Sequence, residues 1–133
     1  MKKGGANAVM VSWSFLGHKW TGENSSLLNT VLRDEWGFRG MALTDFFRNN
    51  GHGFMNADAA LANGVDAMLS TFDGPENNVA DRSHPTSVKQ MRNACKNVMY
   101  TVVSSWAYDG GGTSVGMDKW TRQRVRLARC SRE

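Results

Sequence analysis

A repeated alternation of short apolar runs and helix-like segments is the feature of this 133-residue chain that most constrains its fold. The apolar runs, at residues 8–12, 40–45 and 65–70, are mostly continuous rather than alternating, which is typical of strands buried on both faces of a parallel sheet. A segment with helical spacing follows each run. This order predicts parallel strands joined by crossovers, and hence an α/β fold of three βα units.

Local signals predict where the helices begin and end. We expect a first helix capped by Asn24 or Ser25 and stopped by Gly37, with a buried stripe of Leu27, Leu28, Val31, Leu32 and Trp36. A short helix over residues 56–63 should be closed by Gly64. A third should run from Pro85 to about residue 106, with a stripe of Val88, Met91, Cys95, Val98, Met99, Val102 and Trp106. Polar loops are expected at 13–22, 46–54 and 71–84.

Charge divides the chain into a body and a tail. Residues 1–117 hold equal numbers of basic and acidic side chains, so the net charge of +4 comes from residues 118–133. We expect residues 1–108 to fold and residues 109–133, Gly-rich and then Arg-rich, to form a flexible tail. Because nucleic-acid binding needs basic groups arrayed on a folded face, a nucleic-acid partner is not expected. The alternative, a basic arm that binds nucleic acid, predicts salt-sensitive affinity that is lost with the tail.

Neither a membrane span nor a metal site is indicated. The longest apolar runs are far shorter than the roughly 18 residues that a bilayer requires, and the beginning of the chain lacks the apolar stretch of a secretory signal. We therefore expect a soluble, cytoplasmic protein with no membrane partner. Cys95 and Cys130 have no metal-ligand spacing, so no metal or cofactor is expected, and Cys95 is expected to be buried on the third helix.

All three predicted strands end in polar residues, and the second ends in Asp45. Both doubly wound sheets and barrels bind ligands at the carboxyl ends of their strands, and periodicity alone does not distinguish the two. Aromatic residues are frequent in the loops at this edge: Trp13, Phe15, Trp20, Phe46, Phe47, Phe54 and Phe72. A carboxylate among aromatic rings is typical of a sugar site. The alternatives are that Asp45 caps a loop and that the aromatic residues form core.

Four stretches, "KKGGANAVMVSW", "LLNTVLRDEWGFRGMALTDFF", "GFMNADAALANGVDAMLS" and "PTSVKQMRNACKNVMYTVV", together resemble the glycoside hydrolase family 3 β-glucosidases. The resemblance runs from about Lys2 to Tyr108 and corresponds to the last third of the family's catalytic (β/α)8 barrel. It implies a partial TIM-type barrel and places Asp45 as the nucleophile that attacks the anomeric carbon. Thr44 stands where Ser is common in the family, and Phe46 where Trp is common.

The resemblance also implies a β-glucosidase-like hydrolase acting on a small glycoside, weak or incomplete because the family's earlier strands are absent. A retaining enzyme needs a second carboxyl group as acid and base. We expect it to be Glu76 or, next, Glu23, unless a neighbouring subunit supplies it. Trp13, Phe46, Trp20 and His52 are the candidate substrate-binding residues.

A three-strand piece of a barrel has two bare sheet edges. We therefore expect homo-oligomers in which copies of the chain complete one another. The alternative function is a non-catalytic barrel remnant that binds carbohydrate or assembles with itself.

Overall fold

The computed structural model describes residues 4–47, 53–70 and 85–105. The chain divides into two units, residues 1–101 and 102–133, and the architecture below is that of the first. The domain boundary that we expect between residues 108 and 109 lies outside the described residues.

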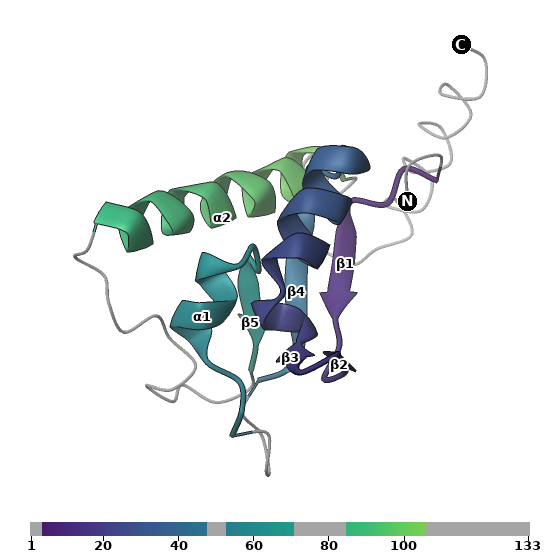
Figure 1. Ribbon diagram of the computed structural model, residues 1–133. Helices are drawn as coiled ribbons and strands as arrows, with labels where there is room; N and C mark the ends of the chain where they lie inside the picture. Colours follow the sequence, from purple (N-terminus) through teal and green to yellow (C-terminus); the bar gives the residue numbers. More distant parts are fainter. Residues whose placement is uncertain (1–3, 48–52, 71–84, 106–133) are drawn as a thin grey trace. The chain divides into compact units, whose positions relative to one another are not determined.

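A parallel three-stranded sheet forms the centre of the unit (Figure 1). Its strands are β1 (Ala8–Val11), β4 (Met41–Phe46) and β5 (Ala67–Leu69), in the order β1-β4-β5. Val9 lies opposite Ala42 in the register of the first pair, and Leu43 lies opposite Ala67 in the second. The α/β class and the parallel pairing are confirmed, and β4 is the central strand.

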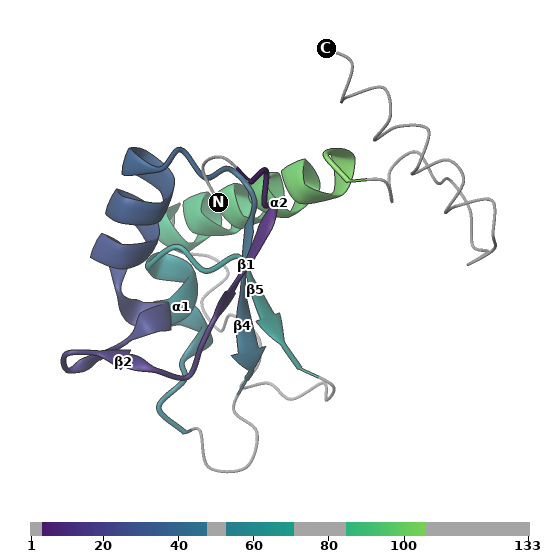
Figure 2. The ribbon, with the colours of Figure 1, turned by 90° about the vertical axis from the view of Figure 1, so that its right-hand side faces the viewer.

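Two helices, η2 (Ser26–Glu35) and α1 (Ala57–Ala62), cover one face of this sheet (Figure 2). Side chains alternate between the faces of a strand, so the residues of β1 and β4 that point to the helices are the buried ones. The core consists of Val11, Trp20, Leu28, Leu32, Phe38, Ala42, Phe47, Met55, Ala57, Ala60 and Val65.

The sequence signals for the ends of these helices are confirmed. The Asn24 Oδ1 accepts a hydrogen bond from the Leu27 N–H at 3.1 Å, and the Asn56 Oδ1 accepts one from the Ala59 N–H at 3.0 Å. Gly37 and Gly64 follow the two helices with φ of +67° and +107°, a region that favours glycine.

The helix η2 is wider than the α-helix that the spacing suggests. Bonds of the i to i+5 kind hold it, as the Trp36 N–H donates to the Val31 carbonyl at 3.0 Å. Leu28 and Leu32 are buried as expected, but Trp36 lies beyond the last turn and is 44% exposed. Its assignment to the buried stripe is wrong because the helix ends one residue earlier.

The segment expected to be a loop at residues 13–22 contains a small hairpin. Its strands β2 (Phe15–Leu16) and β3 (Lys19–Trp20) are antiparallel, and a 3-10 turn, η1 (Thr21–Glu23), follows. Gly17 makes the reversal possible with φ of +65°.

The helix α2 (Pro85–Val103) crosses the amino ends of the strands. The Thr101 hydroxyl donates to the Asn7 carbonyl and accepts from the Met41 N–H, each at 2.8 Å. Asn97 is buried, whereas Met99 is 65% exposed and Cys95 is exposed. The expected buried stripe of this helix, and a buried Cys95, are therefore wrong: the helix turns polar residues inward because the strand ends beneath it need hydrogen-bond partners.

No described helix covers the other face of the sheet. This uncovered face carries the alternate residues of the strands, among them Leu43, Met10 at 66% exposure and Leu69 at 38%.

Candidate active site

Asp45 lies at the carboxyl end of β4, one residue before the strand ends. Because Ala42 and Thr44 point to the helices, Asp45 points to the uncovered face together with Leu43. The side chain is half-buried, and its Oδ1 accepts a hydrogen bond from the Phe46 N–H at 2.7 Å. Among the described residues, this N–H is the sole hydrogen-bond donor to the carboxylate, and no Lys or Arg side chain forms an ion pair with it.

The loop after β1 lies against the end of β4. The Trp13 indole N–H donates to the Phe46 carbonyl at 2.9 Å, and Trp13 is partly exposed. The structure therefore brings Trp13 and Phe46 to the same strand end as Asp45. The contact is to the Phe46 backbone, so it places Trp13 at this strand end but does not place the Phe46 ring beside the carboxylate.

Trp20 has a different position. It is 2% exposed, its indole N–H donates to the Ser12 carbonyl at 2.8 Å, and its ring packs against Phe47 and Phe54 at centroid distances of 6.4 and 5.8 Å. Almost none of the ring is open to a ligand, so in this arrangement Trp20 is a core residue. The alternative reading of the aromatic residues as core holds for Trp20 and Phe47.

The candidate acid/base residues are not brought to Asp45 by the described residues. Glu23 ends η1, which contacts α1 and η2 and so belongs to the helix layer, whereas Asp45 points to the uncovered face. Glu76 and His52 lie outside the described residues. Within the described ranges, no group of three His, Cys, Asp or Glu side chains could hold a metal ion.

The structure contains a buried polar network that our sequence interpretation did not include. It centres on Asp66, just before β5, whose side chain is 3% exposed. Asp66 Oδ2 accepts from Arg33 at 2.6 Å and from the Ala42 N–H at 2.7 Å, and Oδ1 accepts from the Asn97 amide at 2.8 Å. Arg33 also donates to the carbonyls of Gly40 and Gly64, both at 3.1 Å.

Burial raises the pKa of Asp66, and the hydrogen bonds from Ala42 and Asn97 and the charge of Arg33 offset part of that rise. The network ties η2, β4, β5 and α2 together at the amino ends of the strands. The signal in the sequence is a carboxylate that interrupts an apolar run, which is costly to bury unless it is paired.

Comparison with known proteins finds partial matches to β-glucosidases. A stretch of 47 residues, 35% of this chain, is 49% identical to a β-glucosidase of Rhizobium radiobacter. A stretch of 105 residues, 77% of the chain, is 28% identical to a probable β-glucosidase J of Emericella nidulans. A third, of 67 residues and 50% of the chain, is 36% identical to a probable β-glucosidase F of Aspergillus flavus.

These matches span only 6%, 12% and 7% of the three relatives, respectively. No protein-family model matches the chain. Among the described helices, none combines the length and the apolar character needed to cross a membrane.

Proposed function

We propose that this chain is β-glucosidase-like, that residues 1–108 correspond to the last third of a family 3 catalytic barrel, and that Asp45 is the nucleophile in retaining hydrolysis of β-glucosides. The observation that carries the proposal is the position of Asp45. It stands at the carboxyl end of the central parallel strand, on the face without helices, beside Trp13 and Phe46. The similarity to β-glucosidases supports the substrate class.

The reaction would proceed in two displacements. The Asp45 carboxylate attacks the anomeric carbon, and the bond to the leaving-group oxygen breaks while an acid protonates that oxygen. Water then attacks the same carbon, loses its proton to the conjugate base and releases the sugar, which restores Asp45. Trp13 and Phe46 would stack against the apolar face of the sugar ring.

The acid/base group would stand about 5 to 5.5 Å from Asp45 in a retaining enzyme. Glu76 remains the first candidate and Glu23 the second, with a neighbouring subunit as the other source. His52 remains a candidate contact to substrate. Because Glu23 lies in the helix layer, its use would require η1 to move.

The test is hydrolysis of 2,4-dinitrophenyl β-glucoside, whose leaving group needs little help from an acid. Asp45→Asn should lower the rate on the order of a thousandfold or more, because the amide is a poor nucleophile. Glu35→Gln is the matched control, since Glu35 is an exposed carboxylate at the end of η2. Equal rates for the wild type and Asp45→Asn would remove Asp45 from the mechanism.

One alternative is a non-catalytic barrel remnant that binds carbohydrate, and it is favoured because residues 4–47, 53–70 and 85–105 place no second carboxylate beside Asp45. Calorimetric titration with glucose and cellobiose separates the two functions. Binding without turnover of the dinitrophenyl glucoside supports the remnant.

We also propose that copies of the chain cover one another's uncovered face. That face exposes Met10 and Leu69, and the edge strands β1 and β5 each have one unpaired side among the described residues. Sedimentation equilibrium at micromolar concentration should give a mass above 14.7 kDa, and Met10→Lys should shift it toward that value. A wild-type chain that sediments as a monomer would rule out self-association.

A further inference from the structure

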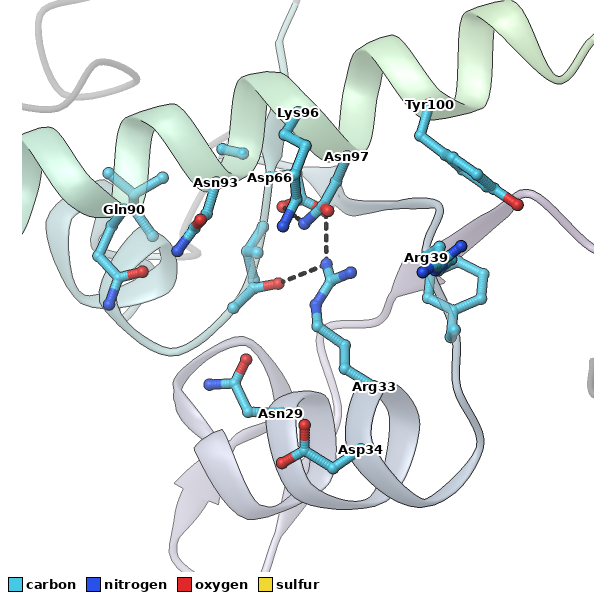
Figure 3. A pocket seen from close by; sticks show the side chains of 15 residues that line it. Asn29, Arg33, Asp34, Arg39, Asp66, Gln90, Asn93, Lys96, Asn97 and Tyr100 are labelled. Atoms are coloured by element: carbon cyan, nitrogen blue, oxygen red, sulfur yellow. Dashed lines mark hydrogen bonds and ion pairs between the residues drawn. The ribbon is translucent and has the colours of Figure 1, made fainter.

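A hollow of about 430 Å³ lies between η2 and α2, next to the amino ends of β4 and β5 (Figure 3). Its volume falls within the range of small-molecule sites. The hollow is distinct from the proposed active site, because the two lie at opposite ends of β4. Met41 begins this strand beside the hollow, and Asp45 lies four residues further on, roughly 13 Å away at the rise of a strand.

The buried network described above forms the inner wall of the hollow. Arg33, Asp66 and Asn97 line it, but their polar groups already bond to one another and to backbone atoms. Arg33 and Asp66 neutralise each other's charge. These three residues therefore fix the shape of the hollow and leave ligand contacts to the side chains around them.

Among the other polar residues of the hollow, Asn29 donates its amide to the Ser25 hydroxyl and the Asn63 carbonyl, whereas five others are uncommitted in the described part of the chain. Arg39, from the turn before β4, and Lys96, from α2, form no ion pair with a carboxylate in the described part of the chain. The side chains of Gln90 and Asn93 project from α2 toward η2, and that of Tyr100 lies beside Arg39 (Figure 3). None of the three makes a hydrogen bond to another described residue.

The balance of charge in the hollow is positive. The lining contains three cations, Arg33, Arg39 and Lys96, against two carboxylates, Asp66 and Asp34. Since Arg33 is paired with Asp66, Arg39 and Lys96 remain against Asp34, which leaves a surplus of one positive charge. A site with free guanidinium and ammonium groups, and with free amides beside them, favours an anionic ligand that also carries hydroxyl groups.

We propose that this hollow binds a small hydroxylated molecule that carries a phosphate or carboxylate group. Arg39 and Lys96 hold the oxyanion from two sides, the first with its planar pair of donors and the second as a point charge. Gln90, Asn93 and the Tyr100 hydroxyl bond the hydroxyl groups. The proposal does not depend on the reaction assigned to Asp45.

The experiment is calorimetric titration of the full chain with glucose 6-phosphate, gluconate and glucose. The first two probes distinguish a phosphate from a carboxylate, and glucose presents the hydroxyl groups without the anion. Binding of either anion in the micromolar to millimolar range is expected. Arg39→Gln and Lys96→Gln should each weaken it by about tenfold, as the loss of one charge-assisted hydrogen bond does.

Two matched controls keep the test specific. Arg92→Gln and Lys89→Gln remove the same charges from exposed positions of α2 that do not line the hollow, and they should leave affinity within about twofold. Arg39 and Lys96 are both exposed, so their variants should keep the wild-type circular dichroism spectrum. The proposal is overturned if neither anion binds at 10 mM, a concentration on the order of the weakest affinities for a specific site. It is also overturned if glucose binds as tightly as the anions, or if the control variants lose as much affinity as Arg39→Gln and Lys96→Gln.

Discussion

Replacing Asp66 by alanine tests the buried network directly. The substitution removes the acceptor of three donors: the Ala42 N–H, the Arg33 guanidinium and the Asn97 amide. Removing one partner of a buried ion pair costs about 3–5 kcal/mol, and each buried donor left without an acceptor costs about 1–3 kcal/mol.

The expected loss in the free energy of unfolding is about 3–5 kcal/mol. The costs do not add in full, because Arg33 keeps its bonds to the carbonyls of Gly40 and Gly64. Whole domains are stable by about 5–15 kcal/mol, so the substitution would remove a large share of the total.

Urea unfolding followed by circular dichroism and by tryptophan fluorescence measures the loss. Asp34→Ala is the control, because Asp34 is exposed on η2 and should change stability by less than about 0.5 kcal/mol. Asp66→Asn keeps the shape and one acceptor oxygen and should lose about 1–3 kcal/mol, which keeps the test informative if the alanine variant does not fold. A loss of less than about 0.5 kcal/mol in Asp66→Ala would refute the reasoning.

Two further predictions concern the same end of the sheet. Because burial raises the pKa of Asp66 above its ordinary value of 3.8, the folded state holds this proton more tightly than the unfolded state. The stability of the wild type relative to Asp66→Asn should therefore fall as the pH rises from about 4 through the folded-state pKa, and a rise over that window in urea titrations would contradict the pKa direction. In Gly40→Ala, the new Cβ would collide with the Asn7 carbonyl, a backbone group that cannot turn aside, so we expect a loss of about 3 kcal/mol or more in thermal or urea unfolding. Gly53→Ala, where nothing lies within 4 Å of the added atom, should change stability little, and equal losses in the two variants would show that the close approach of Gly40 to Asn7 is not rigid.

The parallel sheet could be predicted because its signals are local. The apolar runs gave β1, β4 and β5, and single residues such as Asn24, Asn56, Gly37 and Gly64 gave the ends of the helices. The hairpin formed by β2 and β3 also has a local signal, Gly17 between two short extended pairs. It was missed because strands of two residues carry too little periodicity to separate from a loop.

The orientation of α2 could not be predicted from periodicity. Its apolar stripe suggests that Met99 and Cys95 face the sheet, but the structure turns Asn97 and Thr101 inward. Their partners, Asp66 and Asn7, lie 31 and 94 positions away in the chain. The spacing of apolar residues along one helix does not predict hydrogen-bond partners that are so distant in the sequence.

The candidate site shows the same division. A polar residue at a strand end can be read from the sequence, and Asp45 does lie at that end beside Trp13 and Phe46. The surroundings of Trp20 cannot be read from the sequence, because a loop tryptophan and a core tryptophan have the same local sequence signal. Only the structure shows that Phe47 and Phe54 pack against Trp20.

The hydrogen bonds of Thr101 bear on the order in which the chain can fold as it is made. Thr101 bonds to the Met41 N–H, 60 positions earlier, and to the Asn7 carbonyl, 94 positions earlier. At a synthesis rate of roughly 5–20 residues per second, β1 and β4 wait about 3–12 s after Met41 is added before this side chain exists. During translation, β1 and β4 can pair early, but the hydrogen bonds from Thr101 to their amino-terminal ends cannot form until nearly the whole of α2 has been made.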